Sequence, residues 1–376
     1  MLKKLIIPVL LGALFLLPVP AVKAAYPSVS AQACVLLEER NKQILYEKNA
    51  YARLPMASTT KIMTALVILQ TERNLDRLVT VPAEAAGLEG SSMYLKAGDK
   101  ATVKQLLSGM LIVSGNDAAQ TLAITNAGSV EAFVEKMNAS AKALGLKNTH
   151  FKNPSGLPDE EHYTTAYELA LITREAFKYD IFEEIVALQA QTVTIGEAAR
   201  TLVNHNKMLV LYEGSDGVKT GFTKKAGRCL VSSATRDGTR LITVTLNAPS
   251  DWADHRAMLD YGFDSLLEMQ LCAPGEIKID IKVTGGVKQS TAVTNISGAA
   301  VKTGNKNIKL QKTYVAPNFI YAPVKKGDVI GHVIYEYNGF VYADLPLVAT
   351  EDIKVYIPVK PPKKNLWDYF KILMSF

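Results

Sequence analysis

The order of hydrophobic and polar residues in the first two thirds of the chain predicts strands on either side of a helical region. Residues 33–49, ACVLLEERNKQILYEKN, form two strand patterns around a polar turn. Residues 58–71 are apolar on nearly every side after the first turn, which indicates a buried helix. Further helices are predicted at residues 103–113, 117–125, 130–144 and 165–177. Strand patterns return at residues 217–223, 228–236 and 239–248, and Asp237 with Gly238 forms a favourable hairpin pair between the last two.

The pattern changes near residue 276, where hydrophobic and charged residues begin to alternate. In EIKIDIKV, the residues Ile277, Ile279, Ile281 and Val283 fall on one side of a strand, and later stretches such as GHVIYEY continue this pattern. The fold class we expect is therefore α/β, more strictly α+β, with an antiparallel sheet flanked by helices at residues 25–274. A separate all-β domain is expected at residues 275–358.

The N-terminus has the features of a signal peptide. Lys3 and Lys4 precede the apolar run LIIPVLLGALFLLPVPA, and Val22 and Ala24 occupy the positions that a signal peptidase reads. We expect residues 1–24 to be removed and the protein to be exported. The alternative is a retained N-terminal membrane helix. No cysteine lies near this site, so lipoprotein processing is not indicated.

The C-terminal residues 359–376 predict a proline-rich linker followed by an amphipathic helix. Lys364, Asp368, Lys371 and Ser375 form a single polar stripe, and the rest of the helix surface is apolar. The segment is too short to span a bilayer but suits a position in the lipid interface, as a membrane anchor. The alternative is a helix that packs on its own protein or on a partner.

Composition and charge argue against several other classes of protein. The chain has 376 residues, of which 48% are hydrophobic and 21% charged, as in a globular protein. A disulfide framework is not expected, because the chain has only three cysteines, which is an odd number. We interpret Cys229 as a small buried hydrophobic residue. The five histidines lack metal-ligand spacing, so we expect no metal and no cofactor. Residues 25–274 carry a net charge of −3 and residues 275–376 one of +6. This distribution disfavours nucleic-acid binding by the main domain and suits contact of the C-terminal part with an anionic surface.

Ser58 and Lys61 form the only S-x-x-K sequence of the chain, at the start of the predicted buried helix. Residues three apart share a helix face, so the amine of Lys61 can reach the hydroxyl of Ser58. A desolvated lysine near another cation can act as the base that activates a serine. The simpler interpretation is that Ser58 caps the helix and Lys61 is solvated.

Two further short motifs follow in the chain. Residues 114–116, Ser-Gly-Asn, lie between two predicted helices and could project a hydroxyl and an amide into a cleft, although a capping turn would look the same. Residues 219–221, Lys-Thr-Gly, lie in a predicted strand, where the glycine permits close approach of a substrate. A second Lys-Thr-Gly at residues 302–304 is interpreted as a solvated turn of the β domain.

The order S-x-x-K, S-x-N, K-T-G resembles that of penicillin-binding proteins and serine β-lactamases. Residues 46–66, 110–119, 151–170 and 208–227 are similar to D-alanyl-D-alanine carboxypeptidases, the low-molecular-mass penicillin-binding proteins of the penicillin-binding protein 5 type. The resemblance covers nearly the whole chain. It implies a β-lactamase/transpeptidase-like domain, a substrate that is the D-Ala-D-Ala end of a peptidoglycan stem peptide, and covalent binding of β-lactam antibiotics.

The resemblance also implies roles for individual residues. Ser58 would attack the peptide carbonyl with Lys61 as base and form an acyl-enzyme. Ser114 and Asn116 would relay protons and hold the peptide amide. The substrate-binding residues would be Lys219, Thr220, Gly221 and Phe222, of which the first two bind the terminal carboxylate. The backbone N–H groups of Ser58 and Phe222 would form the oxyanion hole.

The sequence departs from the β-lactamases in ways that affect the expected reaction. The middle motif is S-G-N rather than S-D-N, and no E-x-x-L-N element supplies a deacylating glutamate. Glu168 is expected on the surface, and His162 is expected to have a structural role. We therefore expect slow, stable acylation by penicillin. The alternatives are a D,D-endopeptidase or a serine β-lactamase of the same fold, or a non-catalytic peptidoglycan-binding scaffold.

Overall fold

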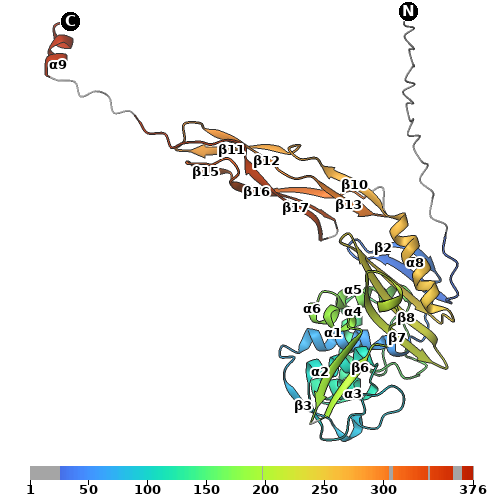
Figure 1. Cartoon of the computed structure of the whole chain (residues 1–376). Coiled ribbons are helices and arrows are strands. Elements are labelled where there is room, and N and C mark those ends of the chain that lie inside the picture. The colour runs from blue at the N-terminus through green and yellow to red at the C-terminus, as the bar shows by residue number, and fades with distance from the viewer. Residues whose placement is uncertain (1–25, 197, 305–307, 338, 359–365, 376) are drawn as a thin grey trace, which may run out of the picture.

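An antiparallel sheet of five strands forms the centre of the N-terminal domain (Figure 1). The computed structural model describes residues 26–196, 198–304, 308–337, 339–358 and 366–375. The strands lie in the order β2 (Gln43–Lys48), β1 (Ala33–Glu38), β9 (Thr239–Leu246), β8 (Gly227–Arg236) and β7 (Ser215–Thr223). Strand β7 is therefore an edge strand. The predicted hairpin is confirmed, because β8 and β9 pair from Arg236 and Thr239 onward.

Helices cover both faces of this sheet because neighbouring residues of its central strands point in opposite directions. Val35 and Leu37 of β1 belong to the larger hydrophobic core, which includes most of the helices. Leu36 belongs to a smaller core on the other face, where Met258 and Leu259 of α8 (Asp251–Ser265) pack. The N-terminal domain thus has three layers, and all six residues of β1 are buried.

The predicted helices are confirmed to within two residues at each end. They are α2 (Val103–Ile112), α3 (Asn116–Ala127), α4 (Val130–Ala143) and α5 (Ala166–Ala176). The remaining small elements are α6 (Asp180–Val186), α7 (Met208–Leu211), η2 (Ala83–Ala85), and the strand pairs β3 (Leu78–Thr80) with β4 (Lys100–Thr102) and β5 (Ala190–Ile195) with β6 (Ala198–Val203). The stretch predicted as one helix from residue 58 begins instead with a 3-10 turn, η1 (Ala57–Thr60), followed by α1 (Lys61–Thr71).

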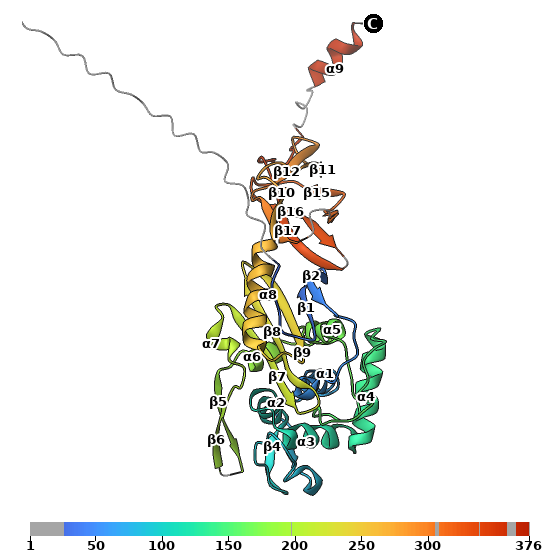
Figure 2. The same ribbon diagram turned by 90° about the vertical axis from the view of Figure 1, so that its right-hand side faces the viewer.

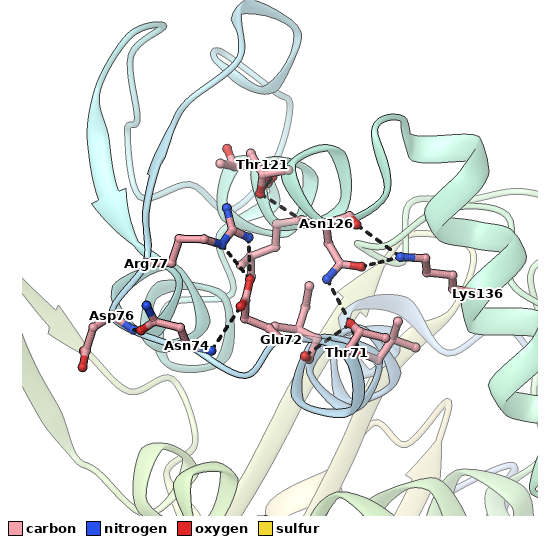
Figure 3. A network of polar contacts seen from close by, with 12 residues as sticks. Thr71, Glu72, Asn74, Asp76, Arg77, Thr121, Asn126 and Lys136 are labelled. Carbon is pink, nitrogen blue, oxygen red and sulfur yellow. Dashed lines mark hydrogen bonds and ion pairs between the residues drawn. The ribbon is translucent and has the colours of Figure 1, made fainter.

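Helix α1 is the central helix of the domain, and its residues from Lys61 to Ile68 are all buried. A polar network fixes its C-terminal end (Figure 3). The side chain of Asn126 donates to the hydroxyl of Thr71 at 2.9 Å and accepts from Lys136 at 3.0 Å. Glu72, directly after the helix, accepts two hydrogen bonds from the guanidinium of Arg77. The helix is thereby held at the end opposite to Ser58.

The C-terminal domain is built around a six-stranded sheet. Its strand order is β14 (Gln311–Val315), β16 (Val329–Tyr337), β17 (Phe340–Ala349), β12 (Ser290–Asn295), β11 (Lys278–Thr284) and β15 (Phe319–Tyr321). All pairs are antiparallel except β11 with β15. Ile277, Ile281 and Val283 are buried as the alternating pattern predicted. The expected α+β domain and C-terminal all-β domain are both confirmed.

Strand β10 (Leu267–Cys272) pairs with β13 (Ala299–Thr303). One expectation about this domain needs correction. The second Lys-Thr-Gly is not a solvated turn. Its lysine, Lys302, lies on β13 and forms an ion pair with Asp237 of the N-terminal domain, and Gly304 lies against Leu45. These contacts join the two domains.

The two ends of the chain are only partly described. The predicted signal peptide, residues 1–24, and residues 359–365 of the predicted linker lie outside the described residues. Helix α9 (Leu366–Leu373) follows, and Leu366, Trp367, Phe370 and Leu373 are exposed on it. Among the described residues, no helix is both long and apolar enough to cross a bilayer. Cys34, Cys229 and Cys272 are all buried and free, as expected for Cys229 in particular.

Candidate active site

A cavity of about 1250 Å³ opens beside the start of α1 and the outer strand β7. The structure brings all three short motifs to this cavity, although they lie far apart in the sequence. Its wall includes Ser58, Ser114, Asn116, Thr220, Gly221 and Phe222. Lys61 and Lys219 are buried directly behind these residues.

The amine of Lys61 has three oxygen partners. Its Nζ lies 3.1 Å from Oγ of Ser58, 2.7 Å from Oδ1 of Asn116 and 2.7 Å from the backbone oxygen of Ser155. Ser58 lies on η1 and Lys61 begins α1, so the short distance follows from helical spacing. The solvated interpretation of Lys61 is excluded, because this side chain is fully buried.

The Ser155 contact was not foreseen from the sequence. The side chain of Asn153 accepts hydrogen bonds from the backbone N–H groups of Ser155, Gly156 and Leu157, which holds the loop in one conformation. Gly156 has φ +88°, and a Cβ there would lie 1.9 Å from the backbone oxygen of Ala57. The sequence Asn-Pro-Ser-Gly is a turn signal, but it does not reveal that a backbone oxygen faces a lysine.

Burial changes the protonation of both lysines. Burial lowers the pKa of Lys61 well below its ordinary value, and the nearby Lys219 lowers it further, whereas Asp117 acts in the opposite direction. Burial also lowers the pKa of Lys219 to about 7. Burial therefore favours the neutral form of the amine beside Ser58.

The Ser-Gly-Asn loop places two polar groups at the cavity. Ser114 has a positive φ of 63°, and its buried hydroxyl has no hydrogen-bond partner among the described residues. Asn116 is the first residue of α3, and its Nδ2 donates to the backbone oxygen of Glu89 at 2.6 Å. The amide of Asn116 is thus oriented so that its oxygen faces Lys61.

Gly221 allows the edge of β7 to approach the start of α1. A Cβ at this position would lie 2.9 Å from the backbone nitrogen of Ser58 and 3.0 Å from that of Thr59. Larger residues would therefore push the strand away from Ser58. Within the part of the chain that the structure describes, the outer edge of β7 pairs with no strand, so an extended peptide can add there. Phe222 is exposed at the rim.

Several basic residues at the cavity had no signal in the sequence. Lys207, Lys224, Lys225 and Arg228 line it. The guanidinium of Arg228 donates to the carboxylate of Asp251 at 2.8 Å. Lys224, Lys225 and Arg228 lie within five positions of one another around the turn between β7 and β8, and the fold adds Lys207 from the segment before α7. The cavity suits a substrate with a negative charge.

His162 and Glu168 were considered as candidates and both have structural positions. His162 accepts from the backbone N–H of Lys152 at Nδ1, and its Nε2 lies 2.7 Å from the hydroxyl of Thr60. Burial lowers its pKa to about 4. The expectation that Glu168 lies on the surface is wrong. Its buried carboxylate accepts from the backbone N–H of Asn148 at 3.0 Å and from the hydroxyl of Thr149 at 2.6 Å.

Comparisons with known proteins match both domains. Residues 20–250 match the family model described as D-alanyl-D-alanine carboxypeptidase, and residues 270–355 match that of the penicillin-binding protein 5 C-terminal domain. The chain is 34% identical over 351 residues to D-alanyl-D-alanine carboxypeptidase DacF of Bacillus subtilis, covering 91% of this chain and 90% of DacF. It is 34% identical to DacC of Escherichia coli, covering 87% and 85% of the two chains.

Solved structures give the same result. Penicillin-binding protein 5 from Haemophilus influenzae is similar with a TM-score of 0.63 at 29% identity, covering 88% of this chain and 99% of that one. The Streptomyces K15 DD-transpeptidase is similar with a TM-score of 0.61 at 36% identity, covering 64% and 99%. The three motifs, the shared cavity and these matches lead to one conclusion: the chain belongs to the D-alanyl-D-alanine carboxypeptidase family, peptidase family S11, and carries the C-terminal domain of penicillin-binding protein 5.

Proposed function

We propose that this protein is a serine D-Ala-D-Ala carboxypeptidase that removes the terminal D-alanine from peptidoglycan stem pentapeptides. The observation that carries the proposal is the buried amine of Lys61, 3.1 Å from the hydroxyl of Ser58. Family membership supports this reaction class. The roles of individual residues are inferred from the geometry of the cavity.

Burial and the nearby Lys219 favour a neutral amine at Lys61, and its three oxygen partners can accommodate one. A neutral amine has two N–H groups and one lone pair. The oxygen of Ser155 and Oδ1 of Asn116 can only accept, and both lie at 2.7 Å, so they take the two N–H groups. The lone pair is left for the hydroxyl of Ser58. Lys61 then receives the proton of Ser58 as Oγ attacks the carbonyl carbon between the last two D-alanines.

The other cavity groups complete the reaction. The backbone N–H groups of Ser58 and Phe222 stabilise the oxyanion, and removal of one such donor typically costs about 2.7 to 4 kcal/mol. The hydroxyl of Ser114 passes the proton of Lys61 to the departing amine of D-alanine. Lys219 and Thr220 bind the carboxylate of the substrate. Water then hydrolyses the ester on Ser58 and restores the hydroxyl.

The same serine explains the expected reaction with β-lactam antibiotics. The attack opens the lactam ring and leaves an acyl group on Ser58. The sequence has no E-x-x-L-N element to supply the deacylating glutamate of a class A β-lactamase. Of the two carboxylate residues that line the cavity, Glu89 and Asp251, the second is paired with Arg228. We therefore expect a slowly hydrolysed acyl-enzyme.

We further propose that the protein acts outside the cytoplasm at the membrane surface. The N-terminal sequence suits export, and the exposed apolar residues of α9 suit the lipid interface. Chemistry and location are separate claims, because D-alanine release can be measured without lipid.

The function is tested by intact-protein mass spectrometry after exposure to penicillin, followed by peptide mapping, and by D-alanine release from a pentapeptide. We expect one penicillin adduct on Ser58, and neither adduct nor D-alanine release in Ser58→Ala. D-alanine release by Ser58→Ala at the wild-type rate would overturn the proposal. Faster cleavage of cross-linked dimers than of pentapeptide would favour the endopeptidase alternative.

A further inference from the structure

The end of the C-terminal domain that lies away from the cavity carries a cluster of exposed apolar side chains. We call it the distal tip, and its members are Val287, Phe319, Tyr321, Val355, Tyr356 and Ile357. Tyr321 is 70% exposed and Ile357 is 79% exposed. Figures 1 and 2 both show β11 and β15 at the end of the domain nearest to α9, with β7 and β8 on the far side of the molecule.

The distal tip is one continuous surface rather than a set of separate residues. The backbone N–H of Tyr356 donates to the oxygen of Gly285 at 2.8 Å, so the last described segment of the domain lies against the turn that carries Val287. Phe319 and Tyr321 lie on β15, which pairs with β11 directly before this turn. Their rings contact each other with centroids 5.4 Å apart. Clustered exposed apolar side chains of this kind mark contact sites.

Lysines surround the distal tip and outnumber the acidic residues there. The carboxylates of Asp328 and Asp352 accept backbone N–H groups, and Glu351 forms an ion pair with Lys288. The flanking lysines are Lys282, Lys288, Lys325, Lys326 and Lys354. Aromatic side chains with basic residues around them are suited to the headgroup region of an anionic bilayer.

The chain itself connects the distal tip to α9. Ile357 belongs to the tip, and α9 begins at Leu366, so eight residue steps separate Pro358 from the helix. A fully extended chain spans at most about 3.6 Å per residue, which gives a reach of roughly 29 Å. If α9 lies in the lipid interface, the tip is held close to the same surface. This continuity favours lipid over a separate protein as the occupant.

We propose that the distal tip is a second membrane contact, which places Tyr321, Tyr356 and Ile357 in the headgroup region of an anionic bilayer beside α9. This inference rests on the membrane attachment proposed above for α9. It assigns to the C-terminal domain a direct lipid-binding surface in addition to its role as a connection between cavity and anchor.

The test uses the full chain with a fluorescent label at a single new cysteine. The three native cysteines are buried, so an environment-sensitive NBD label will react with Val287→Cys at the tip. Val341→Cys, an exposed site beside Phe340 near the other domain, is the matched control. Mixed phosphatidylglycerol and phosphatidylcholine vesicles should raise and blue-shift the emission at position 287 but leave position 341 unchanged. Sedimentation of the protein with vesicles without a change at position 287 would overturn the inference, as would absence of sedimentation.

A set of substitutions provides an independent readout. The triple variant Tyr321→Ser, Tyr356→Ser, Ile357→Ser should weaken vesicle binding about tenfold or more through the loss of apolar contact. The control is Leu267→Ser with Val341→Ser, which removes exposed apolar residues from the end of the C-terminal domain that lies beside the N-terminal domain. The control should bind vesicles as the wild type does. Equal binding of vesicles by the triple variant and the control variant would contradict the inference. So would the finding that the wild type forms a dimer without lipid and that the triple variant does not.

Both variants should release D-alanine at the wild-type rate in lipid-free solution, because the distal tip lies far from the cavity. A wild-type chain that binds vesicles through the tip but releases no D-alanine would contradict the proposed enzymatic function alone. A chain that releases D-alanine but shows no tip contact would contradict the inference of this subsection alone.

Discussion

Lys219 lowers the pKa of Lys61, the amine that contacts the hydroxyl of Ser58. The two lysines belong to motifs more than 150 positions apart in the sequence, and both are fully buried beside one cavity. Two buried cations repel each other, and the one that loses its proton becomes a base. This relationship motivates the first two predictions.

Lys61→Met removes the amine but keeps a long apolar side chain in the same space. We expect the rate of acylation by penicillin to fall by about 10² to 10⁴, the usual contribution of a positioned general base. The rate is measured with fluorescent penicillin under single-turnover conditions, and thermal unfolding serves as the control for folding. Acylation within a few-fold of the wild-type rate would show that Lys61 is not the base.

The pH profile of kcat/KM for D-alanine release should be bell-shaped. The acidic limb reflects Lys61, which must lose its proton to accept that of Ser58, so the rate rises with pH. The alkaline limb reflects Lys219, which has a pKa of about 7. As the pH rises through 7, Lys219 loses its positive charge, and the binding of the substrate carboxylate weakens.

Lys219→Arg tests this assignment, because arginine keeps its charge over the whole range. The alkaline limb near pH 7 should disappear, whatever the absolute rate of the variant. Persistence of the limb would assign it to a group other than Lys219.

Gly221→Ala should impair acylation with little effect on stability. The new Cβ would lie 2.9 Å from the backbone nitrogen of Ser58, so β7 has to move away from the start of α1. We expect a loss of about 10²-fold or more, because the oxyanion donors on the two segments lose their spacing. Penicillin labelling and the unfolding midpoint are measured together, and a variant that labels at the wild-type rate would refute the close-approach argument.

Glu168→Ala should destabilise the fold without altering the chemistry. Its buried carboxylate accepts from two backbone N–H groups and from Thr149, and loss of such charged hydrogen bonds costs about 2 to 3 kcal/mol. The control on the same helix is Glu175→Ala, which removes only an ion pair with Lys178. Urea unfolding compares the two variants. Acylation per folded molecule should match the wild type in both, and an equal effect on stability would count against this role for Glu168.

The fold could be predicted from sequence where the signals are local. Thr102, Ser129 and Thr165 each cap a helix by accepting the backbone N–H three residues later, so the starts of α2, α4 and α5 are specified within four residues of chain. The alternating pattern of β11 specified its buried face in the same way. The spacing of Ser58 and Lys61 also required only the geometry of a helical turn.

The remaining features depend on contacts between distant residues. The sequence does not show whether Glu168 lies on the buried or the exposed side of its helix, because its partners are backbone groups about twenty positions earlier. The oxygen of Ser155 belongs to the backbone, which gives no residue-specific signal. Lys302 repeats a motif of the site, yet its position is set by Asp237 in the other domain. In each case the partner becomes known only when the chain is folded.

The free outer edge of β7 has a consequence for substrate choice. A peptide that docks there becomes a sixth strand, and its main chain supplies the hydrogen bonds irrespective of its side chains. Residues in the middle of a stem peptide can therefore vary between bacterial walls with little effect on turnover. We expect discrimination to depend on the C-terminal end of the peptide, where the proposed mechanism pairs its carboxylate with Lys219.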